Sequence, residues 1–72
     1  MATTLASIST QALERQIDCA RREVQLRQRV YPKLVKERRM QEHTANQEMA
    51  AMEGIVRTLT LLLEARQLEL FG

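Results

Sequence analysis

The chain has 72 residues and a formal net charge of +2, with 44% hydrophobic residues, 3% aromatic residues, one cysteine and no tryptophan. The scarcity of aromatic and β-branched residues argues against a β-sandwich or barrel, and one cysteine cannot form a disulfide within the chain. A domain of this length buries only about 60% of the surface that its unfolded chain exposes. We therefore expect one small all-α domain that gains stability by self-association.

The first predicted helix follows a small, polar segment, residues 1–8, which we expect to be a flexible N-terminus. Ser9 or Thr10 is a candidate N-cap. Beyond it, apolar or semi-apolar residues recur at alternating steps of four and three, the heptad spacing of a packed helix. These seam positions are Leu13, Ile17, Ala20, Val24, Arg27, Tyr31 and Leu34, and Leu26, Val30 and Val35 widen the apolar stripe.

Pro32 falls inside this pattern. Proline removes a backbone donor and clashes with the preceding helical turn. Two structures are compatible with it: a kink near residues 28–31, or a helix that restarts with Pro32 in its first turn. The apolar phase is unchanged across the proline, which favours the kink.

A second predicted helix follows a turn at about residues 36–44, where polar residues surround a lone Met40. Its seam again advances by four and three, and its members are Ala45, Met49, Met52, Val56, Leu59 and Leu63, broadened by Ile55 and Leu62. Gly54 either permits a close helix crossing or is merely tolerated. We predict an antiparallel hairpin over residues 9–66 that forms a homodimeric four-helix bundle, with a trimer or docking on another protein as alternatives.

Positive charge is concentrated between residues 21 and 39. This segment holds eight Lys and Arg against Glu23 and Glu37, a net +6, so the rest of the chain carries −4 of the total +2. Such a cluster indicates either an ordinary solvated helix face or a surface for nucleic acid or an acidic partner. The candidate residues are Arg21, Arg22, Arg29, Lys33, Lys36, Arg38 and Arg39. Tyr31 is the only aromatic residue nearby, so recognition by base stacking is poorly supported.

Residues for catalysis or metal binding are scarce. The chain has one histidine, His43, and one cysteine, Cys19, which we expect to be partly buried and inert, and it has no glycine-rich phosphate loop. We expect no enzyme activity, no metal and no cofactor. No signal peptide or apolar stretch of about 20 residues is present, so we expect a cytoplasmic protein that does not enter a membrane.

Helical periodicity deteriorates after Leu63. Leu68 and Leu70 lie about 200° apart on a helix but on one side of an extended strand, so residues 67–72 are predicted to be an extended tail. The sequence Gln67, Leu68, Glu69, Leu70, Phe71 resembles the Gln-Leu-x-Leu-Phe pentapeptide by which bacterial polymerases and repair proteins dock on the sliding clamp of DNA replication. The resemblance implies that Gln67 contacts the rim of the clamp pocket, that Leu70 and Phe71 fill its cleft and that Leu68 packs at the side. The alternative is a last helical turn in which Leu68 and Phe71 cover the core.

The middle of the chain resembles small helical proteins of bacteriophages and prophages. The residues that carry this resemblance are 29–35, Ala45, Glu48, Met49, Met52, Glu53 and Ile55. It implies a glycine and then Ser or Thr at the turn, where this chain has Arg38, Arg39 and Gln41. The function hypothesis is a non-enzymatic, phage-related adaptor or inhibitor that docks on the clamp through its tail. The alternatives are a nucleic-acid binder that uses residues 21–39, a phage inhibitor of a host defence complex, and a bundle with no partner but itself.

Overall fold

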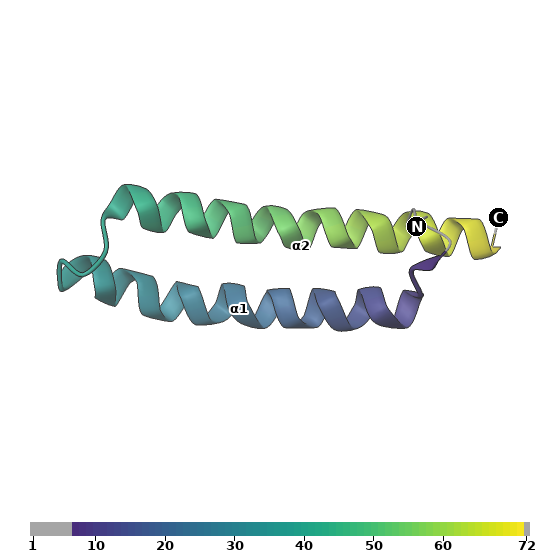
Figure 1. The fold of residues 1–72 in the computed structure, drawn as a ribbon, viewed down its shortest axis with the longest axis horizontal. Helices are drawn as coiled ribbons and strands as arrows, with labels where there is room; N and C mark the ends of the chain where they lie inside the picture. Colours follow the sequence, from purple (N-terminus) through teal and green to yellow (C-terminus); the bar gives the residue numbers. More distant parts are fainter. Residues whose placement is uncertain (1–6, 72) are drawn as a thin grey trace.

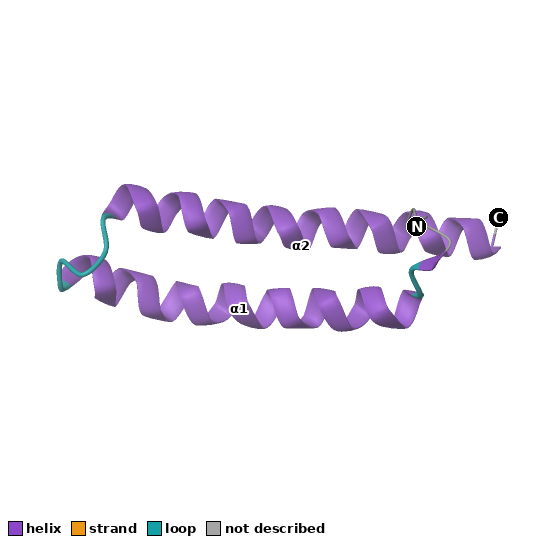
Figure 2. Ribbon diagram, viewed as in Figure 1, coloured by secondary structure: helices purple, strands orange, loops and turns teal. Residues whose placement is uncertain are grey.

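The structure, a computed structural model, describes residues 7–71. Helix α1 (Thr10–Lys36) and helix α2 (Glu42–Phe71) lie side by side and antiparallel, joined by residues 37–41 (Figure 1). The molecule measures 50 × 23 × 17 Å. Among the described residues there is no strand (Figure 2), so the predicted all-α helical hairpin is confirmed. Of the predicted flexible N-terminus, residues 1–6 lie outside the described part of the chain.

Helix α1 begins at a capped turn and continues through its proline. Ser9, with extended backbone angles, accepts a hydrogen bond through its side chain from the backbone N–H of Ala12 at 3.0 Å. This bond satisfies one of the free N–H groups that every helix start exposes, so Ser9 rather than Thr10 is the N-cap. Pro32 lies inside α1 with helix on both sides, so the helix does not restart there.

The end of α1 forms a tight reversal that usually contains glycine. The N–H of Arg39 donates to the carbonyl of Leu34 at 2.9 Å, and the N–H of Arg38 donates to the carbonyl of Val35 at 3.0 Å. This pair of bonds is the Schellman motif, in which the residue after the C-cap is left-handed. Arg38 occupies that position with φ of 59°. It is the one described non-glycine residue with positive φ, and the conformation is costly for an L-residue.

The core follows the predicted seams. The buried apolar residues among those described are Leu13, Ile17, Ala20 and Ala45. The remaining apolar seam positions of both helices are half-buried. A Cβ added at Gly54 would meet no atom within 4 Å, so this glycine does not mark a close helix crossing. The hairpin is therefore held by a thin core along one contact line.

Candidate functional site

The predicted extended tail is helical in the structure. Helix α2 continues to Phe71, so the expectation of an extended segment beginning at residue 67 is wrong for the isolated chain. The alternative, a last helical turn in which Leu68 and Phe71 cover the core, is correct in its helix and wrong in its contacts. Leu68 is 73% exposed, Leu70 56% and Phe71 88%, and Gln67 is exposed as well.

The last turn of α2 has few interactions with the rest of the molecule. Arg66 Nη1 lies 3.2 Å from a carboxylate oxygen of Glu69, within the same helix. The Nε of Arg66 is buried and has no hydrogen-bond partner in the described part of the chain. Figure 1 shows this yellow end of α2 running past the start of α1. Because a helix terminus without tertiary contacts opens at little free-energy cost, residues 67–71 form the least supported part of the hairpin.

The predicted basic surface is exposed but does not lie on one face. All seven candidate cations are exposed: Arg21, Arg22, Arg29, Lys33, Lys36, Arg38 and Arg39. Arg22, Arg29 and Lys36 follow one another at steps of seven, so they share one side of α1. Arg39 lies in the loop with its Nη1 3.6 Å from a carboxylate oxygen of Glu37. The structure thus presents one stripe along α1 and a separate cluster at the loop.

Arg27 connects the two helices. Its Nε lies 2.8 Å from a carboxylate oxygen of Glu23, and its Nη1 donates to the carbonyl oxygen of Glu48 at 3.0 Å. The same Nη1 lies 3.8 Å from the Glu48 carboxylate, and the guanidinium carbon lies 5.6 Å from the centre of the Tyr31 ring. The hydrogen bond to Glu23 raises the pKa of Arg27 above its ordinary value, since the carboxylate stabilises the charged form. Arg27 is therefore a structural link rather than a free cation.

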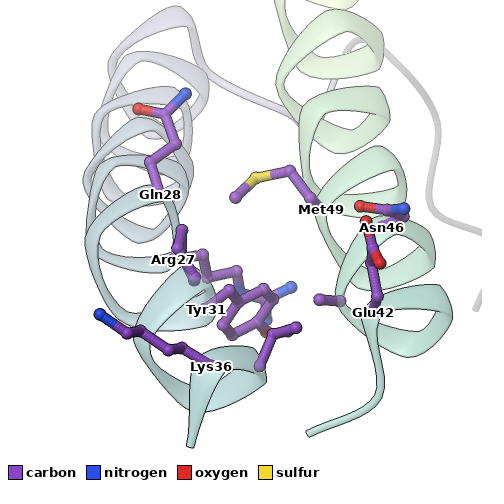
Figure 3. A pocket seen from close by; sticks show the side chains of 10 residues that line it. Arg27, Gln28, Tyr31, Lys36, Glu42, Asn46 and Met49 are labelled. Carbon is purple, nitrogen blue, oxygen red and sulfur yellow. The ribbon is translucent and has the colours of Figure 1, made fainter.

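A groove of about 530 Å³ lies between the helices near the loop (Figure 3). Tyr31 lies between the two helices in this view, with Met49 directed toward α1. The residues that line the groove are Arg27, Gln28, Tyr31, Pro32, Val35, Lys36, Glu42, Ala45, Asn46 and Met49. Sequence reasoning missed the groove, because heptad spacing gives the contact line but not the gaps along it.

The scarce reactive residues stand apart from one another. Cys19 is exposed, so the expectation that it is partly buried is wrong. His43 lies in the first turn of α2 and is also exposed. Among residues 7–71 no group of three His, Cys, Asp or Glu side chains could hold a metal ion. Neither of the two helices, as far as they are described, is long and apolar enough to cross a membrane.

Comparisons with known proteins found no match: no family model, no curated protein and no solved structure is similar to this chain. Two of the ion pairs follow from sequence spacing, because Glu23 and Arg27 are four residues apart on one helix and Arg66 and Glu69 are three apart. The contact of Arg27 with Glu48 on the other helix does not follow from spacing.

Proposed function

We propose that the chain is a non-enzymatic adaptor or inhibitor that docks on a bacterial sliding clamp through Gln67, Leu68, Leu70 and Phe71. The observation that supports this most is the exposure of Leu68 and Phe71 at the end of α2. A large aromatic side chain that is almost fully exposed, beside two exposed leucines, is the kind of apolar group that marks a protein contact. The resemblance to the clamp-binding pentapeptide gives that contact a specific partner.

Docking requires the last turn of α2 to open. In a helix, Leu68 and Leu70 point in nearly opposite directions, so both cannot enter one cleft until the backbone extends. Unwinding residues 67–71 breaks a few terminal backbone hydrogen bonds and separates Arg66 from Glu69. Each exposed ion pair of this kind contributes less than about 1 kcal/mol. Burial of a leucine or phenylalanine side chain contributes about 1.5–3 kcal/mol, which is enough to offset the unwinding.

Calorimetric titration against a purified bacterial sliding clamp tests this proposal. We expect the wild-type chain to bind with micromolar or tighter affinity and the double variant Leu70→Ala, Phe71→Ala to show no binding. The matched control is Glu69→Ala, which lies in the same turn and breaks the pair with Arg66 but leaves the four motif residues intact. It should bind at least as well as the wild type. Absence of wild-type binding, or equal binding by the double variant, would refute the proposal.

Whether docking recruits another protein or blocks host polymerases is a separate question about the same surface. A competition titration with a polymerase-derived clamp peptide tests whether the chain occupies the polymerase pocket. Both an inhibitor and an adaptor displace the peptide from that pocket, and only an adaptor also carries a second partner bound elsewhere on the hairpin. We propose that a cytoplasmic location accompanies either role, since the clamp works on DNA.

Nucleic-acid binding through the basic stripe is the second candidate function. It is favoured by the exposure of Arg22, Arg29 and Lys36 along one side of α1. Contacts between such cations and phosphates release counterions, so the affinity for DNA would fall steeply with salt. Deleting residues 67–72 would leave that affinity unchanged, whereas it would abolish clamp binding. Titrating the chain that lacks residues 67–72 against DNA and against the clamp therefore distinguishes the two functions.

A further inference from the structure

The hairpin exposes more surface than a folded chain of its mass. It has 5797 Å² of accessible surface at 8.3 kDa. The scaling of surface with mass for monomeric proteins gives about 4,600 Å² for this mass. The excess is about 1,200 Å², whereas a stable protein–protein interface of standard size buries about 800 Å² on each partner. One whole side of the hairpin could thus be covered by a partner.

The contacts of Arg27 identify an apolar side of the hairpin. Because Arg27 pairs with both Glu23 on α1 and Glu48 on α2, these two acids lie on the same side. Residues three or seven positions after each of them share that side. From Glu23 this places Leu26 and Val30 there, and both are exposed, at 44% and 37%.

The corresponding positions on α2 continue the same surface. Seven residues after Glu48 comes Ile55, which is 47% exposed, and seven residues further comes Leu62, which is half-buried. Ala51 follows Glu48 by three positions and Thr58 follows Ile55 by three, so both residues share this side of α2. We call Leu26, Val30, Ala51, Ile55, Thr58 and Leu62 the apolar face. It crosses both helices, and its border is charged: Arg27 pairs with Glu23 and Glu48. The exposed cations Arg29 and Lys33 follow Leu26 and Val30 by three positions.

The opposite side of the hairpin is polar. A shallow depression there is lined by Arg21, Val24, Gln25, Gln28, Glu53 and Val56, so these residues of the two helices meet on one side. Asn46 lies seven positions before Glu53 on α2, so it shares this side. This side therefore carries a cation, an acid and amides around Val24 and Val56. The exposed large aliphatic side chains Leu26, Val30 and Ile55 lie on the other side, beside charged ones. This asymmetry is typical of a helix layer that is solvated on one side only.

We propose that the apolar face binds the apolar face of a second copy of this chain, forming a four-helix homodimer. A two-fold interface places the same patch on both subunits, so the exposed aliphatic side chains of one copy meet those of the other. The surface excess of about 1,200 Å² is larger than the about 800 Å² that each subunit of a standard-size dimer buries, so the hairpin exposes enough surface for such an interface. The apolar face does not include residues 67–71, so this dimer stands or falls independently of clamp docking.

Sedimentation equilibrium on the whole chain, with circular dichroism on the same samples, tests the dimer. We expect the wild type to sediment at twice 8.3 kDa. The double variant Leu26→Glu, Ile55→Glu should sediment as a monomer. The matched control, Gln25→Glu with Asn46→Glu, introduces two acids at exposed positions on the polar side and should remain a dimer.

A second, less disruptive double variant keeps the test valid if the two glutamates also unfold the chain. The variant Leu26→Ala, Ile55→Ala should raise the dimer dissociation constant about a hundredfold, because the dimer loses four aliphatic side chains from its interface. A wild-type monomer or trimer would overturn the proposal. So would an unchanged dissociation constant in the alanine variant, or a control that dissociates as readily as the glutamate variant.

Discussion

Replacing Arg38 by glycine should stabilise the hairpin. Arg38 has φ of 59° at the residue after the C-cap of α1, held there by the bonds from Arg38 and Arg39 to Val35 and Leu34. A left-handed conformation costs an L-residue about 1–2 kcal/mol, and glycine adopts it without that cost. Glycine loses more backbone entropy on folding, about 0.5–1 kcal/mol relative to alanine. The net gain for glycine over alanine is therefore about 1 kcal/mol.

The comparison of Arg38→Gly with Arg38→Ala isolates this backbone effect, because both variants lose the same side chain and charge. Thermal unfolding followed by circular dichroism, at one fixed chain concentration, should give a melting temperature about 4–8 °C higher for the glycine variant. Equal melting temperatures, or a higher one for alanine, would mean that Arg38 is not held left-handed in solution.

Three further changes have expected effects on the free energy of unfolding, measured by urea denaturation. Gly54→Ala should raise it by about 1 kcal/mol, because the added methyl group meets nothing within 4 Å and alanine favours the helix; a decrease would reveal a neighbour at this position. Ser9→Ala should lower it by about 1 kcal/mol through loss of the N-cap bond, and Ser9→Asp, which can still accept that bond, should not. Leu13→Ala should lower it by about 3 kcal/mol, since Leu13 is 1% exposed. A loss below 1 kcal/mol there would contradict the assignment of Leu13 to the core.

The helical hairpin was predictable because its cause is local. Heptad spacing places Leu13, Ile17 and Ala20 on one line, and the structure buries all three. The turn followed from the loss of that spacing near Met40. Apolar residues at alternating steps of three and four predict the packed face of a helix without reference to the helix that it contacts. Both packed faces could therefore be predicted from the sequence alone.

The conformation of the last turn was not predictable in the same way. The loss of periodicity after Leu63 correctly indicates that Leu68 and Phe71 do not pack on the core. It does not determine the backbone conformation, which is helical and not extended. Leucine, glutamate and glutamine favour the helix without any tertiary contact. Exposure and secondary structure are therefore separate properties here, and helix propensity determines the second.

The arrangement of the helices has a consequence for how the chain folds. Five loop residues separate the helices, and the link from Arg27 to Glu48 spans 21 positions, so this contact closes a short segment. The buried Leu13 and Ile17 lie near the start of α1, and contacts with α2 there must close a much longer segment. Because the entropic cost of closure rises with segment length, pairing should begin at the loop and advance toward the chain ends. Folding of the hairpin should thus be rapid, with Leu13 joining the core among the last contacts to form.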